Sequence, residues 1–334
     1  MATKPVSTFG TPVLLGKQKV ISQSLVTPKH RGAISVVNYK GGVGKTTISC
    51  LLGYYLAEHT PKGKVLLFDI DPQCSLSLAL GFDPDQVNTT PLTIYELVKP
   101  SKWTKITKTN FGNYVFPPRD SIAPKNLFVV RGSFEVDELD MTIAQTLAGD
   151  GEKYVEHLYL YCKQMLNFFD DYDYIIVDCP PNKMFLTQAM LRASSYYLAV
   201  TIPDAISIYG MPRLLRWVKA IPVAERPRLL GYVLNALNRH GGGMVGSQLT
   251  AEGELYLHIK KDLEKVETEV LGTDPCVGKL PRLDIIAKFL ASRNHKLERL
   301  DFSKRTSGQP SVDECLEDIT ATTIKRIRDY RAKI

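Results

Sequence analysis

The chain has 334 residues, of which 44% are hydrophobic and 23% charged. These values exclude a wholly disordered chain, a collagen-like repeat and a disulfide-stapled miniprotein, and they predict about two domains or one large α/β domain. The net charge of +7 permits an anionic partner without requiring one.

Residues 1–31 contain five basic side chains and no acidic one. Proline, glycine, serine and threonine interrupt the short apolar pieces, so neither a helical nor a strand period persists. We therefore expect a flexible basic N-terminal arm, followed by a single domain over residues 32–334.

Apolar, β-branched segments alternate with helical segments from Ala33 onward. The predicted strands are Ala33–Asn38, Lys64–Asp69, Leu127–Arg131, Tyr174–Asp178, Tyr196–Ile202 and Leu229–Asn235. Because most of them are almost entirely apolar, both faces of the sheet should be covered by helices. The alternation predicts a doubly wound α/β fold with a mostly parallel sheet.

Other segments complete this organisation. Apolar stripes predict helices at Lys45–Glu58 and Val155–Phe169, and a C-terminal helix is expected at about 313–333. Residues 84–126 are weakly periodic and are expected to form an irregular excursion. The triple glycine Gly241–Gly243 predicts a loop before a helix that begins near Ala251.

The segment KGGVGKTT at residues 40–47 lies between the first predicted strand and the first predicted helix. Glycines let the backbone N–H groups wrap around phosphate oxygens, and the helix N-terminus adds a positive dipole. Lys45 supplies a charge for the β- and γ-phosphates, and the Thr46 hydroxyl can bind Mg²⁺. The alternative, a purely structural glycine turn, fits this strand–loop–helix context poorly.

Acidic residues end two of the predicted strands. FDIDPQ, with Asp69 and Asp71, closes the second strand, and DYIIVDCPP, with Asp178, closes the fourth. An aspartate at a strand end is usually a cap or turn residue, but carboxylates beside a phosphate loop can hold the Mg²⁺ shell and orient water. We assign Asp71 to the attacking water, and Asp69 and Asp178 to the outer Mg²⁺ shell.

Tyr39 stands where the general pattern G-x-x-x-x-G-K-[ST] has its first glycine, and Lys40 follows it. The loop resembles that of the ParA/MinD family of deviant Walker ATPases, K-G-G-x-G-K-[ST], and the acidic strand ends resemble its D-x-D-P-Q and D-x-P-P elements. The resemblance covers about Ala33 to Arg293. It implies that Lys40 reaches the phosphates of a second subunit, so that ATP is sandwiched in a homodimer.

Less specific similarities extend the nucleotide site. GYVLN, which ends at Asn235, and LPR, which contains Pro281, resemble the segments that flank adenine in this family. The cofactors implied are ATP and Mg²⁺. The residues assigned to nucleotide binding are Gly41, Gly42, Val43, Gly44, Lys45, Thr46, Thr47, Asn235 and Pro281; those assigned to catalysis are Lys40, Lys45 and Asp71; those assigned to the metal are Thr46, Asp69 and Asp178.

The basic residues after Pro212 are candidates for DNA binding. Pro212 suits the first turn of a helix, and Arg213, Arg216 and Lys219 would then share one edge. ParA-type relatives bind DNA non-specifically through cations on this helix and in the loop after the next strand, where Arg239 lies. The alternative is an ordinary solvated helix face.

A membrane-binding alternative rests on residues 322–334, which are basic and amphipathic but lack strong interfacial anchors. MinD-type relatives, which act as spatial regulators, bind the membrane through such a helix. The resemblance favours the ParA-like branch: a homodimeric ATPase that partitions or positions a plasmid, a chromosome origin or a protein assembly, stimulated by a ParB-like, cargo-bound partner.

The expected location is the cytoplasm, with association with the nucleoid in the ATP-bound state. The six cysteines form no C-x-x-C pair, which favours a reducing compartment. No apolar run is long enough for a membrane span or a secretion signal.

Overall fold

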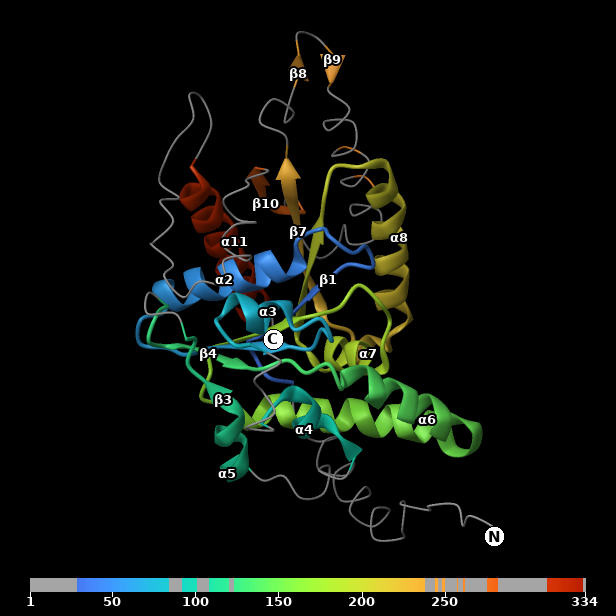
Figure 1. The fold of residues 1–334 in the computed structure, drawn as a ribbon. Helices are drawn as coiled ribbons and strands as arrows, with labels where there is room; N and C mark the ends of the chain where they lie inside the picture. Colours follow the sequence, from blue (N-terminus) through green and yellow to red (C-terminus); the bar gives the residue numbers. More distant parts are fainter. Residues whose placement is uncertain are drawn as a thin grey trace, which may run out of the picture.

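The computed structural model describes residues 29–83, 92–100, 108–119, 123–237, 244–245, 248–249, 257, 261, 275–281 and 311–332. Its centre is an eight-stranded sheet with the order β10-β7-β6-β1-β5-β2-β4-β3 (Figure 1). The strands are β1 (Ala33–Val37), β2 (Val65–Asp69), β3 (Val115–Phe116), β4 (Leu127–Val130), β5 (Tyr174–Asp178), β6 (Tyr196–Thr201), β7 (Arg228–Leu237) and β10 (Cys276–Pro281). A separate antiparallel pair joins β8 (Met244–Val245) to β9 (Gln248–Leu249).

Seven strands of the sheet run parallel, and the short β3 pairs antiparallel with β4. The predicted doubly wound, mostly parallel α/β fold is confirmed. In such a sheet the carboxyl ends of the strands meet at one edge, which is where ligands bind. β5 lies between β1 and β2, so the carboxyl ends of these three strands lie close together.

Helices cover both faces of the sheet, as the apolar strands require. One face packs on α4 (Ile94–Val98), α6 (Val136–Phe168), α7 (Phe185–Ala193) and α8 (Ala205–Ala220); the other packs on α2 (Lys45–His59), α3 (Ser75–Ala79) and α11 (Val312–Ala332). Strand residues alternate between the two cores: Leu66 and Phe68 point to the first, Val65 and Leu67 to the second.

Two helices begin earlier than the sequence predicts. α6 starts at Val136 rather than Val155 and continues through Gly149 and Gly151, although each glycine costs about 1 kcal/mol in a helix interior. Asp137 and Glu138 in its first turn favour the earlier start by complementing the helix dipole.

The expectation that Pro212 occupies a first helical turn is wrong. α8 begins at Ala205, and Pro212 lies in its interior, where a proline costs about 3 kcal/mol. Neighbouring side chains that are buried in the core offset this cost: Met211, Leu214, Leu215 and Val218.

Residues 84–126 contain regular elements in their described parts: α4, α5 (Lys108–Phe111), the 3-10 helix η3 (Gly112–Tyr114) and β3. The side chain of Arg131 at the end of β4 lies over the ring of Phe116, with 4.3 Å between guanidinium and ring centroid. Arg119 donates its backbone N–H to Leu80 O at 3.0 Å. These contacts hold the end of the excursion against the sheet.

α11 seals the β7–β10 edge of the sheet. Arg326 is 8% exposed, and its guanidinium donates to the carbonyl oxygens of Leu230, Pro275 and Cys276. The Tyr330 hydroxyl donates to Leu229 O at 2.8 Å. The helix is therefore part of the domain core.

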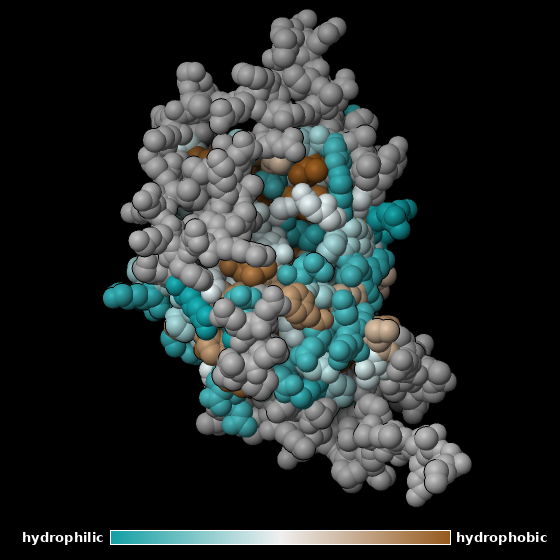
Figure 2. All heavy atoms as spheres, in the orientation of Figure 1, coloured by the Kyte–Doolittle hydropathy of each residue, from teal (hydrophilic) through white to brown (hydrophobic). Residues whose placement is uncertain are grey.

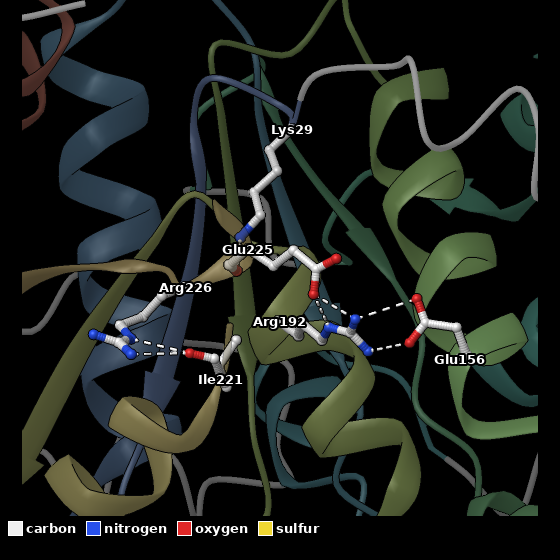
Figure 3. A network of polar contacts seen from close by, with 6 residues as sticks. All are labelled: Lys29, Glu156, Arg192, Ile221, Glu225 and Arg226. Carbon is white, nitrogen blue, oxygen red and sulfur yellow. Dashed lines mark hydrogen bonds and ion pairs between the residues drawn. The ribbon is translucent and has the colours of Figure 1, made fainter. Parts of the chain in front are cut away.

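A polar network lies at the amino-terminal edge of the sheet, where the strands begin (Figure 3). Arg192 donates to Glu225 and, through both terminal nitrogens, to Glu156, at 2.6 to 3.2 Å. The Lys29 ammonium donates to Ser194 O at 2.8 Å and to Glu225 O. Burial lowers the pKa of Lys29 to about 7, against the raising effect of Glu225. The last residues of the expected arm are thus packed into the domain, whereas residues 1–28 lie outside the described residues.

Candidate functional site

The phosphate-binding loop connects β1 to α2 at the carboxyl edge of the sheet. Gly42 and Gly44 have φ values of 72° and 92°, which only glycine adopts without strain. A side chain at Gly44 would also collide with the Asn235 amide, because a Cβ there would lie 2.1 Å from Nδ2. The glycines therefore fix the shape of the loop. Its backbone N–H groups and those at the start of α2 are then available to bind an anion.

Lys45, the first residue of α2, is 6% exposed, and its ammonium donates to Lys40 O at 3.2 Å. Burial lowers the pKa of Lys45, and the nearby carboxylates of Asp178 and Asp71 oppose this change. An ammonium group held at a helix N-terminus with little water around it is suited to bind a phosphate anion.

Asp178 ends β5 beside the loop and is fully buried. Its Oδ1 accepts a hydrogen bond from Ser49 Oγ at 2.8 Å, whereas Oδ2 is buried without a hydrogen-bond partner in the described part of the chain. Burial raises the pKa of Asp178 to about 6, although the hydroxyls of Thr46 and Ser49 lower it. A buried carboxylate oxygen without a partner is stabilised when a further hydrogen-bond donor, or a cation with its bound water, occupies the site.

Asp69 lies directly opposite Asp178 on the neighbouring strand. Burial and the Asp178 charge raise the pKa of Asp69 to about 7. Its Oδ2 accepts hydrogen bonds from the Ser77 backbone N–H at 2.8 Å and hydroxyl at 2.7 Å, and Ser77 Oγ accepts from Gly132 N at 2.8 Å. In this structure Asp69 anchors α3 and the loop after β4 to the site.

Asp71 lies two residues beyond the end of β2, and its side chain is nearly buried. Its Oδ1 accepts a hydrogen bond from Gln73 N at 2.9 Å, which orients the carboxylate. Its charge influences the pKa of both Lys45 and Asp178, so the three groups share one site.

Lys40, the additional lysine, forms an ion pair with Asp204 in the turn between β6 and α8. Its backbone N–H donates to Asn38 Oδ1 at 3.0 Å, and Asn38 Nδ2 donates to Val200 O at 2.6 Å. The start of the loop is thus attached to the end of β6, and the Lys40 ammonium is paired within its own chain.

Tyr39 belongs to an aromatic cluster that the sequence did not reveal. Its ring centroid lies 5.2 Å from that of Trp217 on α8. The Lys183 ammonium, from the segment between β5 and α7, lies 4.9 Å from the Tyr39 centroid and 5.5 Å from that of Trp217. α8 also approaches the loop at Gly210, where a Cβ would lie 3.7 Å from Asn38 Oδ1.

The two residues expected near the adenine lie on neighbouring strands. Pro281 ends β10 and pairs with Leu237 on β7, two residues beyond Asn235. The Asn235 amide donates to Val43 O at 2.9 Å. It therefore supports the back of the phosphate loop, a structural contact that spans 192 residues of sequence.

The basic residues predicted on α8 are all exposed: Arg213, Arg216 and Lys219. They keep the spacing of one helix edge despite the earlier start of α8. Arg239 lies outside the described residues. The structure thus presents three cations on a helix that contacts the loop through Trp217 and Gly210.

These residues fit a nucleoside triphosphate with a divalent cation. The glycine loop, the buried Lys45 and the helix N-terminus form a cradle for phosphates. Thr46, at the second position of α2, and the unsatisfied oxygen of Asp178 supply oxygen ligands of the type that Mg²⁺ and its bound waters prefer.

Comparison with known proteins gives matches over most of the chain. A family model described as "AAA domain" matches residues 31–230. A ParA family protein of Chlamydia pneumoniae is 27% identical over 214 residues, which are 62% of this chain and 73% of that protein. The chromosome-partitioning ATPase Soj of Treponema pallidum is 31% identical over 185 residues, which are 55% of this chain and 62% of Soj.

Among solved structures, a Cyanothece McdA–ATP complex superposes with a TM-score of 0.63. It is 18% identical and the match covers 90% of this chain and 98% of McdA. At this identity the likeness shows the fold, which agrees with the strand order described above.

Proposed function

Because the chain belongs to the ParA/MinD family of P-loop ATPases, we propose that it is an ATP-dependent dimerising ATPase that binds DNA without sequence specificity and positions a cargo. The observation that carries the proposal is the contact between α8 and the phosphate loop. The helix that exposes three cations is also the helix that packs on the start of the loop.

In the proposed hydrolysis, the loop and Lys45 bind the triphosphate, and Asp71 holds the attacking water in line with the γ-phosphate. Thr46 would hold Mg²⁺, with Asp69 and Asp178 in its outer shell, and the ion would neutralise charge that develops on the phosphates. These assignments are supported by the burial of Lys45, Asp69, Asp71 and Asp178 beside the loop, and by the place of Thr46 in the first turn of α2. Asn235 and Pro281 would flank the base.

The proposed dimer depends on Lys40. In the single chain its ammonium pairs with Asp204; in the dimer it would instead contact phosphates bound by the partner subunit. A ligand shifts such an equilibrium by its differential affinity for the two states. Hydrolysis removes the γ-phosphate and would favour separation of the subunits.

DNA binding would use Arg213, Arg216 and Lys219 from both subunits, with Arg239 as a further candidate. Six or more phosphate contacts make an affinity strongly dependent on salt, with losses of about 1000-fold between roughly 50 and 200 mM salt. Such contacts carry no base specificity. An activator bound to the cargo, of the ParB type, would then trigger hydrolysis and release.

The membrane alternative receives no support from α11. Its residues Ile324, Ile327 and Tyr330 are buried against the rest of the domain. On the face drawn in Figure 2, the apolar side chains of the described residues form small areas separated by hydrophilic ones. In the part of the chain that the structure describes, no helix is both long and apolar enough to span a bilayer.

Co-sedimentation with DNA fragments and with anionic liposomes tests the proposal directly. We expect DNA binding with ATP but not with ADP, weakened about 1000-fold between roughly 50 and 200 mM salt. A variant with Arg213, Arg216 and Lys219 changed to glutamine should dimerise normally and lose DNA binding. Binding to liposomes alone would contradict the proposal and support the membrane alternative.

A further inference from the structure

Tyr39 is the residue by which this loop departs from the general phosphate-loop pattern, and its aromatic ring makes two contacts. The ring packs on Trp217, and the Lys183 ammonium lies over both rings. A glycine at this position would leave both partners without this contact. The next residue in the chain is Lys40.

We infer that Tyr39, Trp217 and Lys183 position Lys40, so that the backbone of Lys40 stays fixed while its ammonium moves between Asp204 and the phosphates of a second subunit. The inference rests on the proposed function, in which Lys40 acts across the dimer. Tyr39 directly precedes Lys40 in the chain, so contacts that fix Tyr39 also restrict the backbone of Lys40.

The contacts around residues 38–40 support a fixed backbone and a movable side chain. Asn38 ties the Lys40 N–H to β6, and the Tyr39 ring ties the preceding residue to α8. The Lys40 side chain, by contrast, meets Asp204 at a site where both side chains keep contact with solvent, with 25% and 35% exposed. An ion pair with this access to water exchanges partners at little cost.

The Tyr39 ring, rather than its hydroxyl, makes the contact that matters. The hydroxyl oxygen is buried without a hydrogen-bond partner in the described part of the chain, and burial raises the pKa of Tyr39. A phenylalanine would keep the stacking and remove an unsatisfied polar atom. The rescue of function by Tyr39→Phe therefore separates positioning by the ring from any chemistry of the phenol.

The same cluster connects the loop to the basic edge of α8. Trp217 follows Arg216 directly, and the charge of Arg213 reaches the Tyr39 phenol. The cluster that fixes the backbone of Lys40 is therefore built on the helix that carries the proposed DNA contacts.

Dimerisation of the full chain with a non-hydrolysed ATP analogue and Mg²⁺, measured by light scattering, tests the inference. An aromatic pair and a cation over its rings contribute together enough for about a tenfold effect. We expect Tyr39→Ala and Trp217→Leu to weaken dimerisation about tenfold and exposed Lys183→Gln about threefold, with Tyr39→Phe unchanged. Analogue binding to the monomer should stay within about twofold throughout, because Lys45 and the glycines are intact.

Lys64→Gln is the matched control, since the Lys64 ammonium lies 5.5 Å from the Tyr172 ring at the far edge of the sheet. It should dimerise as the unchanged protein does. Tyr39→Ala that dimerises normally, or Tyr39→Phe that is as defective as Tyr39→Ala, would overturn the inference.

Hydrogen exchange of the nucleotide-free protein separates this inference from the proposed function. The peptide that contains Lys40 should exchange about tenfold faster in Tyr39→Ala than in Tyr39→Phe. If the unchanged protein fails to dimerise, the proposed function is wrong, and this measurement still reports on positioning. Equal exchange in the two variants would show that the cluster does not hold Lys40.

Discussion

The two edges of the central sheet treat buried charge differently. At the amino-terminal edge, Arg192 is bonded to both Glu156 and Glu225, and the Lys29 ammonium has two carbonyl acceptors (Figure 3). At the carboxyl edge, Asp178 keeps a buried oxygen that has no hydrogen-bond partner among the described residues, and it lies beside the Asp69 carboxyl group. The amino edge is complete within the chain, whereas the carboxyl edge is arranged for a charged ligand.

The comparison teaches how to separate structural from functional charge in this fold. Both edges contain ion pairs and buried ionisable groups, so burial alone does not distinguish them. What distinguishes them is whether the chain supplies the compensating partner. Substitutions at the amino edge should therefore change stability, and substitutions at the carboxyl edge should change ligand binding.

Lys45→Ala should have the largest effect. Removing an ammonium that contacts phosphate in a desolvated site costs about 3 kcal/mol, or about 100-fold in nucleotide affinity. The free energy of unfolding of the nucleotide-free protein should change by less than about 1 kcal/mol, because the cost of burying the ammonium offsets its attraction to Asp178 and Asp71. Isothermal titration calorimetry with ATP and Mg²⁺ measures the first quantity. An unchanged affinity for ATP would show that Lys45 does not contact the nucleotide.

The pH dependence of stability should reveal the paired carboxyl groups. Burial raises the pKa of Asp69 to about 7 and that of Asp178 to about 6, whereas an unfolded aspartate titrates near about 3.9. Between these values the folded chain binds more protons than the unfolded chain, so its stability falls as the pH rises. The loss should be about 2 kcal/mol between pH values of about 6 and 8.

Asp69→Asn should reduce this loss, since the amide does not ionise. Urea unfolding of the nucleotide-free protein at the two pH values gives the comparison. A loss of the same size in Asp69→Asn would mean that other groups govern the pH dependence and that the carboxyl pair is already compensated.

Arg192→Gln should have a smaller effect than Lys45→Ala or the pH change. It should alter the stability of the fold and leave ligand binding unchanged. The guanidinium bridges two carboxylates in a partly exposed network, so its loss should lower the free energy of unfolding by about 1 kcal/mol. Lys64→Gln removes an exposed ion pair at the same edge and should cost less than about 0.5 kcal/mol. Neither variant should alter nucleotide affinity. A loss of affinity in Arg192→Gln would show that the two edges are coupled.

The sequence predicted the features that depend on local patterns. The strand from Tyr174 to Asp178 was predicted with the bounds that the structure has, because its apolar run is flanked by polar residues. The phosphate loop was predicted because its glycines, lysine and threonine are consecutive. Asp69, Asp71 and Asp178 were found because they end strands, and parallel strands end at one edge.

The features that the sequence did not predict are contacts between distant residues. The Lys40–Asp204 pair joins residues 164 apart, and the Asn235–Val43 hydrogen bond joins residues 192 apart. No spacing rule reveals such pairs. The early starts of α6 and α8 were missed for a related reason: core packing offsets the unfavourable glycines and Pro212, and local propensity contains no information about it.

The contacts of Arg326 also have a consequence for protein synthesis. Its guanidinium donates a hydrogen bond to the Leu230 carbonyl, which lies 96 residues earlier in the chain. At ribosomal rates of about 5 to 20 residues per second, that carbonyl waits roughly 5 to 20 seconds for its donor. During this interval the Leu230 carbonyl lacks the donor that the folded domain supplies.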